Sequence, residues 1–147
     1  MIRSAWLDKD ITDALAIRRA VFIGEQHVPE AVEQDGHDRA ARHVVVYDGE
    51  KPVATGRMLV LDGKCILGRV AVLKEERGKR YGDFVVRLLI RKATESGFDE
   101  QHIHAQTAAR GFYEKLGFEA YGDEFLEAGI RHISMLHKGD VGDKCAE

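Results

Sequence analysis

The segment from Val70 to Asp83 places a basic, glycine-containing turn between a β-branched strand and an amphipathic helix. The turn reads Arg77-Gly78-Lys79-Arg80-Tyr81-Gly82. A helix that begins after such a turn presents backbone N–H groups without intrahelical partners, so the pattern predicts a phosphate site. It is not a P-loop, because no Gly-Lys-[Ser/Thr] triplet occurs, and it is not a dinucleotide fingerprint, because Gly-x-Gly-x-x-Gly is missing. Taken in isolation, an ordinary charged connection between strand and helix explains the same residues.

A second segment that could take part in a reaction follows about thirty residues later. It reads Phe112-Tyr113-Glu114-Lys115-Leu116-Gly117-Phe118. It is typical of the last turn of a helix that a left-handed glycine, Gly117, brings to an end. Helical spacing places Tyr113 on one stripe with Ala109, Phe112 and Leu116. A tyrosine in this place either packs at the edge of a core or donates a proton in a reaction.

Charge is distributed unevenly along the chain. The net charge of −3 argues against nucleic acid as the main partner, because phosphate-backbone binders carry basic faces. Between Lys74 and Lys92 there are seven basic and three acidic residues, whereas Glu25 to Asp38 holds five acidic residues and no Lys or Arg. The first region suits an anionic ligand, and the second suggests recruitment of a cationic amine.

The composition fits one globular domain. At 147 residues, with 44% hydrophobic and 32% charged residues, the chain can build one core, and no apolar run approaches the roughly 18 residues of a membrane span. The start lacks the pattern of a signal peptide, so we expect a cytoplasmic protein. Cys65 and Cys145 are too few and too oddly placed for a disulfide framework, which predicts free thiols.

Hydrophobic periodicity and turn signals give an order of elements. Asp48-Gly49 and Asp62-Gly63 indicate hairpin turns, so three antiparallel strands follow one another in the middle of the chain. The expected strands are Ile2–Leu7, His43–Tyr47, Pro52–Leu61, Cys65–Leu73, Gln101–Gln106, Phe118–Tyr121 and Ile130–His137, with a loop carrying Glu124 and Glu127 between the last two. The expected helices run from about Ile11 to Ile23, from Gly82 to Gly97 and from Thr107 to Leu116, with a polar loop and a short helix between Gly24 and Arg42.

In this order and spacing, the two segments resemble the signature regions of the GNAT superfamily of acyl-CoA N-acyltransferases. Three further segments resemble its ElaA-like branch: Glu25-Gln26, His104-Ala105-Gln106 and Glu127-Ala128-Gly129-Ile130-Arg131-His132. The resemblance covers about Ile2 to His137. It implies an α/β protein with the GNAT fold, a mixed and mostly antiparallel sheet flanked by helices, as one domain over residues 1–138 followed by a flexible tail over 139–147. It also implies that the strand at Val70 and the strand ending at Gln106 splay apart to admit the coenzyme.

The resemblance further implies that the chain transfers an acetyl group from acetyl-CoA to a primary amine, directly in a ternary complex and without a metal. The family's phosphate-binding pattern, Gln/Arg-x-x-Gly-x-Gly/Ala, is met by Arg77 and Gly82, while Arg80 stands at the place of the middle glycine. A side chain there narrows the cradle or binds phosphate itself. The residues expected to bind the coenzyme are Val70, Ala71, Val72, Arg77, Gly78, Lys79, Arg80, Tyr81, Gly82, Asp83 and Phe112.

By the same resemblance, Tyr113 protonates the departing thiolate, and an amide N–H near Val72 polarises the thioester carbonyl. The expected acceptor-site residues are Glu25, Gln26, Asp35, Arg57, His104, Gln106, Glu127 and His132. We expect a small amine as acceptor, and no nucleic acid or membrane as partner. A homodimer is compatible with the sequence, which does not fix the oligomeric state. The alternative function is an acyl-CoA-binding sensor or partner module without turnover.

Overall fold

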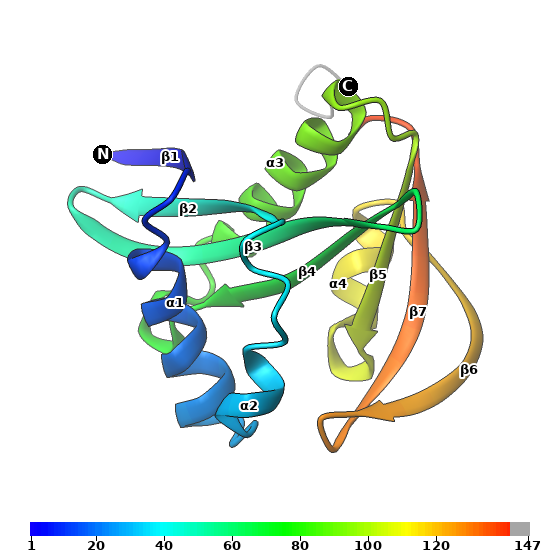
Figure 1. Cartoon of the computed structure of the whole chain (residues 1–147), viewed down its shortest axis with the longest axis horizontal. Helices are drawn as coiled ribbons and strands as arrows, with labels where there is room; N and C mark the ends of the chain where they lie inside the picture. The colour runs from blue at the N-terminus through cyan, green and yellow to red at the C-terminus, as the bar shows by residue number, and fades with distance from the viewer. Residues whose placement is uncertain (142–147) are drawn as a thin grey trace.

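The computed structural model describes residues 1–141, which form a seven-stranded mixed sheet with helices on both faces (Figure 1). The strands lie in the order β1-β2-β3-β4-β5-β7-β6. They are β1 (Ile2–Leu7), β2 (Arg42–Asp48), β3 (Lys51–Leu61), β4 (Lys64–Val72), β5 (Glu100–Gln106), β6 (Glu119–Glu127) and β7 (Ile130–Lys138). The helices are α1 (Thr12–Arg18), α2 (Glu30–Glu33), α3 (Tyr81–Glu95) and α4 (Arg110–Lys115), with short helical segments η1 (Arg19–Glu25), η2 (Lys74–Glu76) and η3 (Thr107–Ala109). The predicted fold class is confirmed.

The predicted three-strand meander is present. β2 pairs with β3 and β3 with β4, both antiparallel, and the turns fall at Gly49 and at Asp62-Gly63, with positive φ angles at all three residues. Alternate residues of β2 face opposite sides of the sheet. Val44 and Val46 join the larger core, under α3 and α4, whereas Val45 joins the smaller core, under α1.

The sheet opens between β4 and β5. These two strands are parallel neighbours, but their pairing covers three positions only, from Cys65↔Gln101 to Leu67↔Ile103. Beyond them, the pairing of β3 with β4 is interrupted by a bulge next to Arg69, whose φ of 50° lies in the left-handed region. A bulge bends its strand and disrupts the ladder. The predicted splaying of these two strands is therefore confirmed, as Figure 1 shows.

Helix α3 makes the crossover from β4 to β5 and packs closely on β3. Its buried residues are Tyr81, Val85, Val86, Leu89, Ile90 and Ala93, while Arg87, Arg91 and Lys92 stay outside the core. The contact is closest at Gly56, where an added Cβ would lie 2.6 Å from Val85 and 2.7 Å from Leu89. This glycine therefore sets how near the helix can approach the sheet.

Some boundaries differ from those expected. The predicted loop with Glu124 and Glu127 is wrong, because β6 extends to Glu127 and takes up the extra residues in a bulge between Tyr121 and Phe125. The first helix continues past Arg18 as the π-helical segment η1. Val141, in the expected tail, packs against the larger core, while Cys145 and the rest of 142–147 lie outside the described residues. Within residues 1–141, no helix is long and apolar enough to cross a membrane.

Gly56 generates a prediction about stability. Gly56→Ala forces a methyl group against the side chains of α3, and overpacking of this kind costs about 1–3 kcal/mol. We expect a lower free energy of unfolding, measured by urea denaturation. Gly68→Ala is the matched control, since Gly68 also lies in a strand and an added Cβ there has no neighbour within 4 Å. Equal stability of the two variants would contradict the close approach.

Candidate active site

The opening between β4 and β5 leads into a cavity of about 750 Å³. We call it the main cavity. Its floor includes Val70, Ala71 and Val72 of β4, and Phe112 and Tyr113 of α4 also line it. Seven of the predicted acceptor-site residues line it as well: Gln26, Asp35, Arg57, His104, Gln106, Glu127 and His132. Segments from both halves of the chain thus meet at one site.

A second cavity, of about 570 Å³, lies at the N-terminus of α3. Gly78, Arg80, Tyr81, Gly82 and Asp83 line it. Four residues line both cavities: Val72, Arg77, Gly82 and Phe112. The two cavities are therefore neighbours along β4 and the start of α3.

The first turn of α3 has the features of a phosphate cradle. The first helical hydrogen bond runs from the Phe84 N–H to the Arg80 carbonyl at 3.1 Å, and no side chain caps the helix. The amides of the three preceding residues are left for a ligand at the positive end of the helix dipole. Arg80 itself adopts φ +67°, the left-handed conformation for which glycine is best suited. The residues present therefore fit an anionic ligand, with one non-glycine residue at a strained position.

Two residues that were predicted to bind the coenzyme, and one that was predicted to bind the acceptor, form ion pairs within the protein. Lys79 binds Glu76 at 2.9 Å and lines neither cavity. Arg77 forms a two-pronged ion pair with Glu25, with both N–O distances at 2.7 Å. Glu25 also lines neither cavity, so the structure places it beside the phosphate turn rather than with the other acceptor-site residues.

Tyr113 is buried at the end of the main cavity nearest α4. Its ring packs edge-to-face against Phe112, with centroids 4.9 Å apart, and against Phe118, at 5.6 Å. Burial raises the pKa of the Tyr113 hydroxyl well above its usual value, so this group is protonated at neutral pH. It is held by packing and retains a proton that it can donate.

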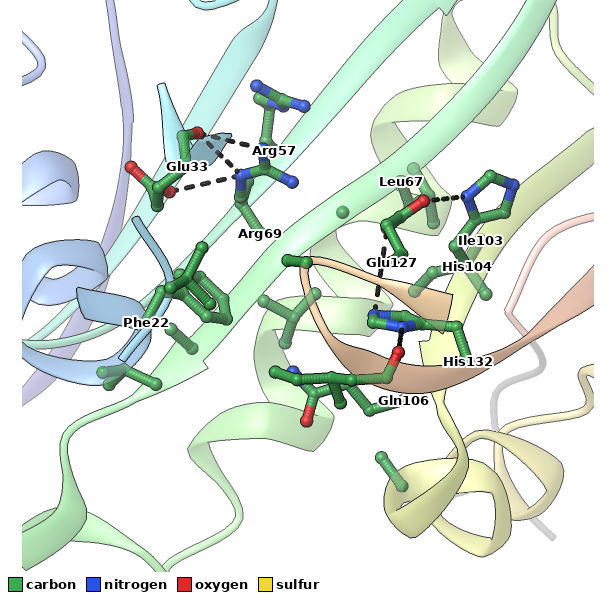
Figure 2. Close-up of a pocket in the computed structure, with 18 of the residues that line it drawn as sticks. Phe22, Glu33, Arg57, Leu67, Arg69, Ile103, His104, Gln106, Glu127 and His132 are labelled. Carbon is green, nitrogen blue, oxygen red and sulfur yellow. Dashed lines mark hydrogen bonds and ion pairs between the residues drawn. The ribbon is translucent and has the colours of Figure 1, made fainter. Parts of the chain in front are cut away.

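Two histidines flank a carboxylate on the wall formed by β5, β6 and β7 (Figure 2). Glu127 lies 3.0 Å from Nδ1 of His104, and its other oxygen lies 3.8 Å from Nε2 of His132. Nδ1 of His132 donates to the Ile130 carbonyl at 2.7 Å, which fixes the ring. The hydrogen bond to Glu127 raises the pKa of His104, and the same bond lowers the pKa of Glu127. The imidazole of His104 can therefore accept a proton, and Glu127 stabilises the charged form.

A pair of glutamines closes one end of the main cavity. The Gln106 amide donates to Gln26 at 2.9 Å, and the Gln26 amide faces the Gln106 oxygen at 3.4 Å. Gln26 directly follows η1, whereas Gln106 is the last residue of β5. The pair therefore bridges the two sides of the opening.

The acidic stretch is not the open cationic-ligand site that the sequence suggests. Three of its carboxylates are neutralised by three arginines, and we call this group the arginine–carboxylate cluster. Its members are Arg18, Glu33, Asp35, Asp38, Arg57 and Arg69. Burial alone would raise the pKa of Asp35, but hydrogen bonds from Arg57 at 2.8 and 3.0 Å outweigh it, so that pKa lies well below its usual range. These carboxylates hold the α2 loop in position and are not open to bind an amine.

Two residues at the site were not predicted from the sequence: Arg69, which lines the main cavity, and Phe125, which packs against two histidines of its lining. Arg69 lines the main cavity and reaches it through the left-handed bulge, which no local motif announces. Phe125 lies between the two histidines, 5.0 Å from the His104 ring and 5.9 Å from the His132 ring. The contacts of Phe125 were not predicted because its segment was expected to be a loop and not part of β6. Cys65 was predicted to be a free thiol, and burial raises its pKa to about 11, which makes it a poor nucleophile.

Comparison with known proteins identifies the class. A family model for the acetyltransferase (GNAT) domain matches residues 7–138, so the chain belongs to the GNAT family. The uncharacterised N-acetyltransferase YjcF of Bacillus subtilis is 39% identical over 130 residues, which cover 88% of this chain and 93% of YjcF. The predicted family is confirmed.

Solved structures show the same architecture. The structure of ElaA from Escherichia coli superimposes with a TM-score of 0.84 at 27% identity, covering 94% of this chain and 100% of ElaA. An acyl-CoA N-acyltransferase from Pseudomonas aeruginosa has a TM-score of 0.83 at 26% identity, covering 93% of this chain and 99% of its own. The chain is thus a GNAT acetyltransferase by family and fold, and this family uses acetyl-CoA.

Arg80 generates a prediction about coenzyme binding. Arg80→Gly and Arg80→Ala both remove a positive charge beside the cradle, so we expect each to weaken acetyl-CoA binding roughly threefold and to flatten its salt dependence, measured by calorimetry. Only the glycine variant relieves the left-handed strain. Its free energy of unfolding should therefore exceed that of the alanine variant by about 1 kcal/mol. Tighter binding by the glycine variant with unchanged salt dependence would instead make Arg80 an obstruction.

Proposed function

We propose that the protein transfers an acetyl group from acetyl-CoA to a primary amine by direct transfer in a ternary complex. The observation that carries the proposal is that Tyr113 and the His104–Glu127 pair line one cavity, which shares four lining residues with the second cavity at the phosphate cradle. Such a transfer needs three parts: a group that gives a proton, a group that takes a proton, and a turn that binds acetyl-CoA.

The phosphate cradle and β4 form the part of the site that binds acetyl-CoA. The free amides at the start of α3, together with Arg77 and Arg80, hold the phosphates of the coenzyme. The backbone of Val70 to Val72 lines the main cavity where β4 has left β5, so its polar groups are available to the pantetheine arm. An amide N–H near Val72 then polarises the thioester carbonyl.

The chemistry requires two proton movements. The His104–Glu127 pair takes a proton from the amine nitrogen, whose lone pair forms the new C–N bond to the thioester carbon. Collapse of the adduct breaks the C–S bond, and Tyr113 gives its proton to the departing sulfur. Free tyrosine, with a pKa of about 10, is a weaker acid than a thiol, near 8.5, and burial raises the pKa of Tyr113 further. Tyr113 therefore assists mainly by a hydrogen bond that stabilises the thiolate as it forms.

Tyr113→Phe tests the proton donor. The change removes only the hydroxyl, so folding and acetyl-CoA affinity survive while kcat for thiol release falls by roughly 10²-fold or more. Tyr121→Phe is the matched control, since Tyr121 is exposed on β6 and lines neither cavity. Full kcat in a folded Phe variant would return Tyr113 to a packing role. Acetyl-CoA binding without thiol release by the unmodified protein across a broad amine panel would make it a sensor instead.

Glu127→Gln tests the proton acceptor through pH. The carboxylate raises the pKa of His104 from 6.5, so the acidic limb of kcat/KM has its midpoint above that value. Removing the negative charge destabilises the imidazolium, and we expect the limb to move to lower pH with the same amine acceptor. Glu124→Gln, on the same strand but lining neither cavity, should leave the limb in place. An unmoved limb in Glu127→Gln would exclude the pair as the titrating base.

The same pair predicts a window of stability. The raised pKa of His104 contributes stability that is complete below about pH 6.5 and lost as pH rises through the folded value. The lowered pKa of Glu127 contributes stability above about pH 4.5, lost as pH falls through its folded value. The stability difference between the unmodified protein and Glu127→Gln should therefore be largest between these two values.

A further inference from the structure

Arg69 occupies an unusual position beside the main cavity. It lies at the bulge of β4, and its φ of 50° is uncommon for a residue with a side chain. Bulges re-aim side chains, and left-handed conformations at non-glycine residues persist where the surroundings hold them in place. Here the strained backbone turns a guanidinium into the lining of the cavity.

Neutral and acidic groups hold one edge of that guanidinium. Nε and Nη2 donate to the Glu33 carbonyl at 3.2 and 2.9 Å, and Nη2 also lies 3.2 Å from Asp35. Nη1 has no hydrogen-bond partner among residues 1–141. Figure 2 shows a guanidinium nitrogen of Arg69 directed away from Glu33. A fixed guanidinium with an open donor is suited to bind an anion.

The other two arginines of the arginine–carboxylate cluster are not presented in this way. Arg18 is 1% exposed and uses all three nitrogens on Glu33 and Asp38, while Arg57 is 7% exposed and binds Asp35 and Asp38. The side chain of Arg69 is 23% exposed. The cluster therefore holds Arg69 in position and leaves its outer edge to the cavity.

Arg69 faces the proposed proton acceptor. Figure 2 shows Arg69 on the side of α2 and β4, with His104 and Glu127 on the other side. The hydrogen bond from His104 lowers the pKa of Glu127, and the positive charge of Arg69 adds to the effect. Burial lowers the pKa of Arg69, as do the neighbouring charges of Arg57 and Arg18, whereas Asp35 and Glu33 act in the opposite direction, so a further anion at Nη1 would favour the charged guanidinium. The two walls thus present an open N–H donor on one side and a carboxylate–imidazole pair on the other to a single ligand.

We propose that the amine acceptor is a small aminocarboxylate, whose carboxylate binds Nη1 of Arg69 while its amino group lies at the His104–Glu127 pair. The inference rests on the proposed function and specifies its substrate class. Nη1 carries N–H groups that can make a charge-assisted hydrogen bond to one carboxylate oxygen. A polyamine without an acidic group would leave Nη1 of Arg69 without a partner.

The test compares paired acceptors. Thiol release from acetyl-CoA is measured with L-amino acids of each side-chain class, β-alanine and 4-aminobutyrate, each beside its own carboxamide. We expect kcat/KM to be at least about tenfold higher for the carboxylate in the preferred pair. Arg69→Gln should bring that ratio close to one by lowering kcat/KM for the carboxylate alone. Arg91→Gln, an exposed arginine on α3 that lines neither cavity, should keep the ratio.

The outcomes separate the inference from the proposed function. Two results would overturn the inference that the acceptor is an aminocarboxylate but would leave the proposed acetyltransferase function intact. One is transfer to amines without a preference for the carboxylate form, and the other is a preference that a folded Arg69→Gln variant retains. Acetyl-CoA binding without transfer to any amine would overturn both. Thermal unfolding and acetyl-CoA calorimetry report whether Arg69→Gln is folded. If it is not, Arg69→Lys and the paired acceptors on the unmodified protein decide the question, since the latter need no variant.

Discussion

The short pairing between β4 and β5 is the constraint on which the rest of the site depends. Had the parallel ladder continued past Leu67↔Ile103, the backbone of Val70 to Val72 would be occupied by β5. The bulge at Arg69 ends that pairing and leaves polar backbone groups at the edge of a cavity. Buried backbone groups require partners, so a strand opened in this way is prepared for a ligand that supplies them.

The arginine–carboxylate cluster is the second constraint, because it fastens the α2 loop to β3 and β4. Arg18 is almost fully buried, and such a charge is tolerated only with close partners, here Glu33 at 2.7 Å and Asp38 at 2.8 Å. Removing one partner would leave an uncompensated charge in the interior. The cluster therefore fixes one wall of the main cavity as firmly as hydrophobic packing fixes the other.

Local patterns predicted much of this molecule, and long-range pairing decided the remainder. The meander and the strand-turn-helix segment follow from alternation, glycine turns and helical spacing, and they appeared where expected. The partners of the acidic stretch were not predictable, because Arg18, Arg57 and Arg69 reach it from distant segments. The bulges at Arg69 and before Phe125 were equally hidden, since a bulge depends on the neighbouring strand and not on its own residues.

The end of η1 connects the donor and acceptor sides of the site. Glu25 and Gln26 are adjacent, yet the first binds Arg77 of the phosphate turn and the second pairs with Gln106 at the end of β5. Glu25 ends the π-helical segment η1 and Gln26 follows it, and such segments are often found at functional sites. Any anion bound by Arg77 competes with Glu25 for the same guanidinium. Two consecutive residues thus contact opposite sides of the site, Glu25 at the phosphate turn and Gln26 at the end of β5.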